Sequence, residues 1–249
     1  MKLHVEKLCK RFYEPARGEF FACNEISFEV GQGEIFGLLG PNGAGKTTTL
    51  RVISTILKPT SGSAHLGDID IFQDPDAARR AMGFLSSSTG LYERLTPREI
   101  LTYFGRLSGV AEPALKEKIE SLFLALDFKQ FADARCGKLS QGTKQKVSIA
   151  RAIIHDPKLM IFDEPSTGLD VLATQSMHEF IKQAKGEGKC IVFSTHIMSE
   201  AEKLCDRIGI INDGKILAQG TLSELRALTG ETYLEEVFMA LVRKYELAK

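Results

Sequence analysis

The chain has 249 residues, of which 43% are hydrophobic, enough for one α/β domain with a sizeable core and a smaller second lobe. Its 32 basic and 32 acidic residues cancel, which argues against a global attraction to nucleic acid or acidic lipid, and we expect no nucleic-acid partner. Five scattered cysteines without a C-x-x-C pair argue against a disulfide framework or a zinc site, and no apolar stretch approaches the roughly 18 residues that a membrane-spanning helix needs.

Apolar and polar residues alternate in the N-terminal part of the chain. Leu3 and Val5 are separated by polar neighbours, and so are Ile26, Phe28 and Val30. This period of two predicts half-buried antiparallel strands.

A phosphate-binding loop follows the apolar run Ile35–Leu39. Residues 40–47 read GPNGAGKT, which matches G-x-x-x-x-G-K-[ST], and a helical pattern with Leu50 and Ile53 comes next. A strand that delivers such a loop to a helix N-terminus predicts a nucleoside triphosphate site with Mg²⁺, because backbone N–H groups there cradle phosphates. We expect Lys46 to reach the β- and γ-phosphates and Thr47 to offer its hydroxyl to the metal. The loop residues expected at the nucleotide are Gly40, Pro41, Asn42, Gly43, Ala44, Gly45, Lys46, Thr47 and Thr48.

Further short apolar runs follow, and helical patterns alternate with them. They predict a doubly wound, mostly parallel sheet. The four runs read as buried parallel strands are Ile35–Leu39 and residues 159–162, 191–193 and 208–211.

Between the early and late strands the pattern is helical, with Ile100, Phe104 and Leu107 at helical spacing. The predicted fold is therefore an α/β phosphate-loop NTPase core of the RecA-like type, with an N-terminal antiparallel β subdomain and an inserted α-helical subdomain. We predict a core of residues 1–87 and 156–220, a helical subdomain of residues 88–155 and a helical tail of residues 221–249.

Residues 139–145, LSQGTKQ, open a helix inside the predicted helical subdomain. Ser140, Gln141 and Gly142 at a helix N-terminus would form an anion site, although Ser140 is also an ordinary N-cap residue. Since the chain already has one phosphate loop, the simplest ligand for a second anion site is the γ-phosphate held by another copy, bound head to tail.

Two carboxylates end the apolar strand that begins at residue 159. Asp163 and Glu164 then lie at the C-terminal edge of the sheet, where ligands of such sheets bind. Asp163 is predicted to hold magnesium together with Thr47. Glu164 is the predicted general base for the attacking water, a role that contributes roughly 10²–10⁴-fold to the rate. Without the phosphate loop, the same pair would be a solvated strand end.

His196 ends another buried strand, in the sequence Ser-Thr-His. The pattern places this strand beside the carboxylate strand, so we predict that His196 contacts the γ-phosphate and the attacking water. The remaining histidines have no such setting and are expected to be structural.

Taken together, these motifs resemble those of ATP-binding subunits of ABC transporters, over about residues 1–220. By this resemblance, residues 40–48 are the Walker A loop, 159–164 the Walker B strand, 139–145 the signature, and 166–170 (STGLD) the D-loop, which ends at Asp170. His196 falls at the switch histidine. Phe12 falls at the aromatic that stacks on adenine, with Tyr13 as the next candidate; Phe12 could also be a core aromatic.

The resemblance implies that ATP binds between two copies, each ATP lying between one phosphate loop and the partner's Ser140–Gly142 segment. Hydrolysis reopens this dimer and performs work on a separate membrane-spanning permease subunit. The protein is then expected at the cytoplasmic face of the cell membrane, as a peripheral subunit.

The sequence departs from the family pattern in two places. Ser87 stands where the family usually has a Gln that reaches the metal, which puts metal affinity and coupling in doubt rather than ATP binding. In the signature, Gln141 and Thr143 replace the more frequent Gly and Gln, while Ser140 and Gly142 are retained.

The helical lobe is short. The tail ETYLEEVFMALV, residues 231–242, is similar to ATPase subunits of simple bacterial exporters, and so are residues 33–51 (GEIFGLLGPNGAGKTTTLR) and 91–99 (LYERLTPRE). Among these exporters, sodium-extruding systems are the most similar. Drug, polysaccharide or lipid export stays open, because no residue here would contact the exported substrate. A soluble ABC protein is disfavoured by the single Walker A loop and the absence of sustained heptads. The signature and STGLD segments argue against a phosphate-loop kinase or GTPase.

Overall fold

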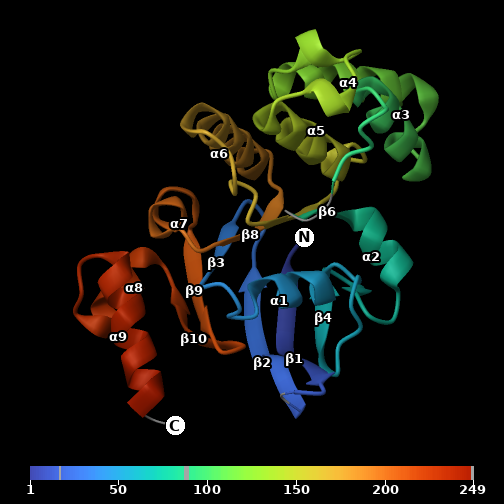
Figure 1. Ribbon diagram of the computed structural model, residues 1–249. Helices are drawn as coiled ribbons and strands as arrows, with labels where there is room; N and C mark the ends of the chain where they lie inside the picture. Colours follow the sequence, from blue (N-terminus) through green and yellow to red (C-terminus); the bar gives the residue numbers. More distant parts are fainter. Residues whose placement is uncertain (17, 87–89, 248–249) are drawn as a thin grey trace.

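The computed structural model describes residues 1–16, 18–86 and 90–247, and two β-sheets organise this part of the chain (Figure 1). The smaller sheet is antiparallel, in the order β2-β1-β4-β5. Leu3 and Val5 are buried while His4 is exposed, which confirms the predicted alternation. Its strands are β1 (Leu3–Glu14), β2 (Gly18–Val30), β4 (Ser61–Leu66) and β5 (Ile69–Asp70).

The larger sheet has the order β10-β9-β3-β8-β7-β6, and only the edge strand β10 runs antiparallel to its neighbour. Every residue of β3, β7 and β8 is buried, which explains why these strands read as continuous apolar runs. The four predicted parallel strands are confirmed. The strands are β3 (Ile35–Leu39), β6 (Met82–Ser86), β7 (Leu159–Asp163), β8 (Cys190–Thr195), β9 (Arg207–Asn212) and β10 (Lys215–Gly220).

Strand register brings the predicted site residues to one edge of this sheet. Leu39, the last residue of β3, pairs with Thr195, the last residue of β8. Asp163, the last residue of β7, pairs with Ser194. The phosphate loop, the carboxylates and His196 therefore all leave the sheet at its C-terminal edge.

Helices cover both faces of the larger sheet. Helix α1 (Lys46–Ile53) lies between the two sheets, where its Leu50 and Val52 share a core with Phe28 and Phe36. These two rings stack with centroids 4.7 Å apart. On the opposite face, α6 (Val171–Gly186) packs through Met177. The other helices flanking the sheets are α2 (Pro75–Ala81) and α7 (Met198–Leu204).

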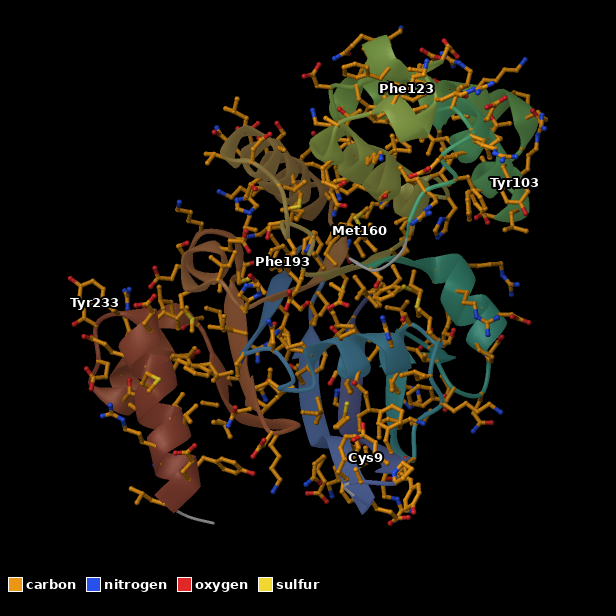
Figure 2. All side chains as sticks on the ribbon, viewed as in Figure 1. Cys9, Tyr103, Phe123, Met160, Phe193 and Tyr233 are labelled. Carbon is orange, nitrogen blue, oxygen red and sulfur yellow. The ribbon has the colours of Figure 1, made fainter. Side chains whose placement is uncertain are left out.

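A helical lobe stands between β6 and β7 in the sequence and lies above β6 and beside α6 in Figure 1. Figure 2 shows Phe123 inside this lobe, and Met160 and Phe193 where the lobe meets the sheet. All three belong to one continuous buried cluster. The lobe contains α3 (Pro97–Leu107), α4 (Glu112–Ala125), the short 3-10 helices Lys129–Phe131 and Cys136–Lys138, and α5 (Gln141–Ile153).

Two helices, α8 (Leu222–Thr229) and α9 (Leu234–Leu247), follow β10. Leu225, Val237 and Leu241 bury against Ile208 and Ile210 of β9, so the tail is packed onto the edge of the larger sheet. Within the described residues, no helix has the length and apolar character to cross a membrane. The assignment of domain boundaries stays a prediction.

Candidate nucleotide site

The phosphate loop packs closely against its neighbours, which explains two of its glycines. A Cβ atom on Gly40 would lie 2.2 Å from the carbonyl oxygen of Ile211, and one on Gly45 would lie 2.3 Å from that of Ala22. Gly45 also has a φ of 104°, which L side chains rarely adopt. The loop therefore depends on glycine to pass between β2 and β9 and to begin α1 at Lys46.

Lys46 is 4% exposed, and its ammonium group is shared between its own loop and a carboxylate. The Nζ atom donates to the carbonyl oxygens of Gly40 at 2.7 Å and Pro41 at 3.0 Å. It also lies 3.1 Å from Oε1 of Glu164. The predicted phosphate ligand and the predicted general base are thus in direct contact.

Asp163 is buried beside the loop, and its two carboxylate oxygens differ in their hydrogen bonding. Its Oδ1 accepts hydrogen bonds from Thr47 at 3.0 Å and Ser194 at 2.9 Å. Its buried Oδ2 has no hydrogen-bond partner within the described part of the chain. Burial raises the pKa of Asp163, and the two hydroxyls oppose this. An unpartnered carboxylate oxygen beside a hydroxyl is a donor set that fits a hard divalent cation such as Mg²⁺.

Glu164 and His196 meet across the edge of the sheet. The Nδ1 atom of His196 lies 3.2 Å from Oε2 of Glu164, whose side chain is 17% exposed. The backbone N–H of Glu164 donates to the Ser194 carbonyl at 3.2 Å and to its hydroxyl at 3.1 Å. Glu164 also has a φ of 48°, a left-handed conformation that turns the chain sharply where β7 ends. This turn aims the carboxylate at both Lys46 and His196.

An open pocket of about 530 Å³ adjoins these groups. Phe12 and Tyr13 both line it; Phe12 is half-buried with Lys10 Nζ 5.1 Å from its ring centroid, whereas Tyr13 is 71% exposed. The described lining residues are Phe12, Tyr13, Glu14, Phe20, Ala22, Asn42, Gly43, Gly45, Lys46, Thr47, Thr48 and Glu164. Aromatic walls leading to a phosphate loop suit a nucleotide, with its base against the rings.

The predicted signature residues lie apart from this pocket. Ser140 and Gln141 are exposed, and Ser140 is the N-cap of α5, accepting from the Thr143 N–H at 3.2 Å. Gly142 faces Ala173 of α6 instead of the phosphate loop. The described residues that line the pocket include none of Ser140–Gly142, so within one copy these residues are not brought to the nucleotide site.

Of the two remaining predicted site residues, Asp170 and Ser87, the structure describes the first. Asp170 is the N-cap of α6, and its Oδ1 accepts from the Ala173 N–H at 2.8 Å. Ser87, predicted to take part in metal binding, lies outside the described residues.

Three residues of the site were not predicted from sequence. Ser194 bridges Asp163 and the backbone of Glu164, and its place beside His196 in Ser-Thr-His was the available signal. Phe20 joins the aromatic wall with its ring centroid 6.1 Å from that of Phe12. Gln145 donates from Nε2 to the Pro165 carbonyl at 2.7 Å and thereby ties α5 to the segment after Glu164, a contact without a local sequence signal.

The comparison with protein families agrees with this geometry. The family model described as ABC transporter matches residues 23–167, more than half of the chain. The chain belongs to the ABC transporter family. As an ABC transporter ATP-binding subunit, it has ATP as its substrate and ATP hydrolysis as its activity, and the predicted fold class is confirmed.

Individual relatives of this ABC subunit extend the likeness over almost its full length. It is 40% identical to the ABC transporter ATP-binding protein NatA of Bacillus subtilis, over 94% of this chain and 96% of that protein. It is also 40% identical to the Nod factor export ATP-binding protein I of Rhizobium sp., over 82% of this chain and 67% of that protein. A solved structure of an ATP-binding subunit of an ABC transporter superposes with a TM-score of 0.86 at 31% identity, covering 97% of this chain and all of that one.

Proposed function

We propose that this chain binds and hydrolyses ATP at the site between β3, β7 and β8, with Glu164 as the general base. Supporting this is the contact of Glu164 with both Lys46 and His196 at the C-terminal edge of the sheet. Lys46 and the backbone of residues 40–48 bind the phosphates, and Phe12 stacks on the adenine ring. His196 contacts the γ-phosphate and orients the water that Glu164 deprotonates.

Thr47 and Asp163 would hold a Mg²⁺ ion, with Ser87 as a further predicted ligand. The unpartnered Oδ2 of Asp163 supports this assignment. When bound, the ion neutralises charge on the phosphate oxygens.

We further propose that two copies act together. Ser140, Gln141 and Gly142 at the N-terminus of α5 bind the γ-phosphate held by the partner copy, and Asp170 lies near the shared boundary. The exposure of Ser140 and its separation from the copy's own pocket support this arrangement, because a ligand for this anion site must come from outside the chain.

The ATPase drives efflux of Na⁺ through a separate permease subunit, which holds it at the cytoplasmic face of the membrane. The substrate assignment is supported by the resemblance of the tail, residues 231–242, to sodium-extruding exporters. Export of a drug, polysaccharide or lipid is the second candidate, since one relative is named for export of Nod factor. In both cases the ATPase site is the same.

The test of the partner is capture from native membranes. Tagged Glu164→Gln chain is added to detergent-solubilised membranes with Mg-ATP, and the recovered proteins are identified by mass spectrometry. The double variant Glu164→Gln/Lys46→Ala is the control for nucleotide dependence. We expect a multi-spanning protein in equal amount with the first variant and less with the second. Recovery of only soluble, ribosomal or DNA-bound proteins would overturn the transporter proposal in favour of a soluble ABC ATPase.

The substrate is then tested with the captured complex in proteoliposomes. The complex with the wild-type subunit should move Na⁺ when ATP is present, and added K⁺ should not inhibit this movement. The complex with Lys46→Ala should not move Na⁺. ATP-dependent movement of a drug or lipid probe without Na⁺ flux would replace sodium by the second candidate.

A further inference from the structure

A buried carboxylate lies beneath the candidate site and has no role in the proposed chemistry. Glu200 belongs to α7, directly after the turn that carries His196, and its side chain is 7% exposed. Burying a charge is costly unless polar groups compensate it. The compensating groups around Glu200 come from three segments that also carry predicted site residues.

The first connection runs to the turn at His196. Thr195 donates from Oγ1 to Oε2 of Glu200 at 2.7 Å, and the same hydroxyl accepts from the Ile197 backbone N–H at 3.0 Å. An ionised carboxylate can only accept, so Thr195 is the donor toward Glu200, and a lone pair of its hydroxyl oxygen accepts from Ile197. This chain of two hydrogen bonds spans His196 and defines the turn on which its imidazole sits.

The second connection runs to the segment after Glu164. Ser166, the first residue of the STGLD segment, is 8% exposed, and its side chain helps to lower the pKa of Glu200. The third runs to α6, where Nε2 of His178 lies 3.6 Å from Oε1 of Glu200. Burial raises the pKa of Glu200, but the side chains of His178, Thr195 and Ser166 lower it by more, so the carboxylate is ionised at neutral pH.

We propose that Glu200 is a positioning residue for ATP hydrolysis, which holds the His196 turn in place through its hydrogen bond with Thr195 and its contact with His178 of α6. It touches no nucleotide itself. Its effect depends on geometry, because His196 Nδ1 must stay near Oε2 of Glu164, where it lies at 3.2 Å. Displacing a catalytic group by about 1 Å costs up to roughly 10²-fold in rate. The inference rests on the catalytic role proposed for His196.

The first test is the Glu200→Gln substitution, with Glu202→Gln as the matched control. Glu202 lies on the same helix but faces Arg226, with 33% of its side chain exposed. We expect Glu200→Gln to lower kcat between about tenfold and a hundredfold. The nucleotide dissociation constant should stay unchanged, because Thr195 and His178, the partners of Glu200 among the described residues, lie outside the phosphate loop. Thr195→Val, which keeps the side-chain volume but removes the hydroxyl, should lower kcat in the same way. Equal losses of kcat and nucleotide affinity in both variants would overturn the proposal in favour of a merely structural role.

The second test asks whether Glu200 acts through His196. Single-turnover hydrolysis is measured for wild type, Glu200→Gln, His196→Ala and the double variant. A positioning residue has no further effect once the group it positions is gone, so Glu200→Gln should not slow the His196→Ala protein. Slowing by the same factor in both backgrounds would overturn the inference alone. An unchanged rate in His196→Ala by itself would overturn the proposed role of His196 and this inference with it.

A third measurement needs no turnover. Hydrogen exchange at the Ile197 amide reports the bond to Thr195 directly. We expect faster exchange at Ile197 in Glu200→Gln and unchanged exchange in Glu202→Gln. Equal protection of this amide in all three proteins would show that Glu200 does not hold the turn.

Discussion

Glu164 Oε1 lies 3.1 Å from Nζ of Lys46, so the predicted base and the predicted phosphate ligand form an ion pair inside the candidate site. His196 contacts the other oxygen of the same carboxylate at 3.2 Å. A phosphate that binds Lys46 competes with Glu164 for the ammonium group. Nucleotide binding is therefore expected to release one carboxylate oxygen at the position where a base is needed.

The Glu164→Gln substitution should separate binding from hydrolysis. Glutamine keeps the shape of the side chain but cannot accept a proton from water, so kcat should fall roughly 10²–10⁴-fold. Nucleotide affinity should be kept or increased, because the neutral amide competes less for Lys46. Steady-state hydrolysis and equilibrium binding of ATP measure the two effects, with exposed Glu117→Gln on α4 as the control. A variant that loses affinity in proportion to kcat would contradict the assignment of Glu164 as the base.

The same variant should accumulate as a dimer with saturating Mg-ATP, since ATP that is not hydrolysed stays between the two copies. Light scattering with and without nucleotide measures this. A variant that stays monomeric under these conditions would mean that the two-copy arrangement is wrong or needs the permease.

Lys46→Ala should weaken nucleotide binding. A hydrogen bond to a charged group contributes about 1.5–3 kcal/mol, which corresponds to roughly 10–150-fold in affinity. The substitution also leaves Glu164 without its cation beside the incoming phosphates. Titration of a fluorescent ATP analogue measures the affinity, and Lys58→Ala, an exposed lysine shortly after α1, is the control. Unchanged affinity would refute the phosphate-loop assignment.

Ser140→Arg should block hydrolysis without weakening ATP binding to a single copy. Ser140 is exposed and outside the pocket of its own chain, so the bulky side chain would obstruct only a ligand presented by a partner. Binding is measured at dilute protein and hydrolysis at high concentration, with Ser121→Arg on α4 as the control. Equal loss of both properties would mean that Ser140 serves its own nucleotide or the fold.

Local sequence patterns predicted the strands and loops that form within one short segment of the chain. The run Ile35–Leu39 is a wholly buried strand, as its uninterrupted apolar sequence requires. The phosphate loop and the Asp163–Glu164 pair could be placed at the C-terminal edge because parallel strands end together there. The second anion site at residues 140–142 indicated another copy of the chain, whereas only the resemblance to ABC subunits indicated the permease.

The contacts that sequence reasoning missed are those made across distant segments. The strand Ser61–Leu66 has only two fully buried residues, so its pattern was too weak to indicate a strand; pairing with β1 supplies its stability. Ser194 and Glu200 are ordinary polar residues in the sequence, and their roles become visible only when β8 pairs with β7 and α7 folds back on Thr195. Pairing between distant segments determines the strand Ser61–Leu66 and these side-chain contacts alike, and such pairing leaves no periodic pattern in the local sequence.

His155 should make the stability of the protein depend on pH. Its Nε2 lies 2.9 Å from the Met82 carbonyl, and its buried Nδ1 has no hydrogen-bond partner within the described residues. Burial lowers the pKa of His155 below the ordinary value of about 6.5, and the Met82 carbonyl opposes this only in part. The unfolded chain therefore binds a proton more readily than the folded protein does. Stability from this group is fully present above about pH 6.5 and is lost as the pH falls through the lowered pKa.

Chemical unfolding between pH 8 and pH 5, roughly the range over which histidine titrates, measures this dependence in wild type and His155→Gln. Glutamine keeps an N–H donor for the Met82 carbonyl but does not titrate, so the variant should lose less stability than wild type as the pH falls. At pH 8 it should be somewhat less stable than wild type, because the amide fills the imidazole site less well. Parallel curves for the two proteins would show that another group causes the pH dependence.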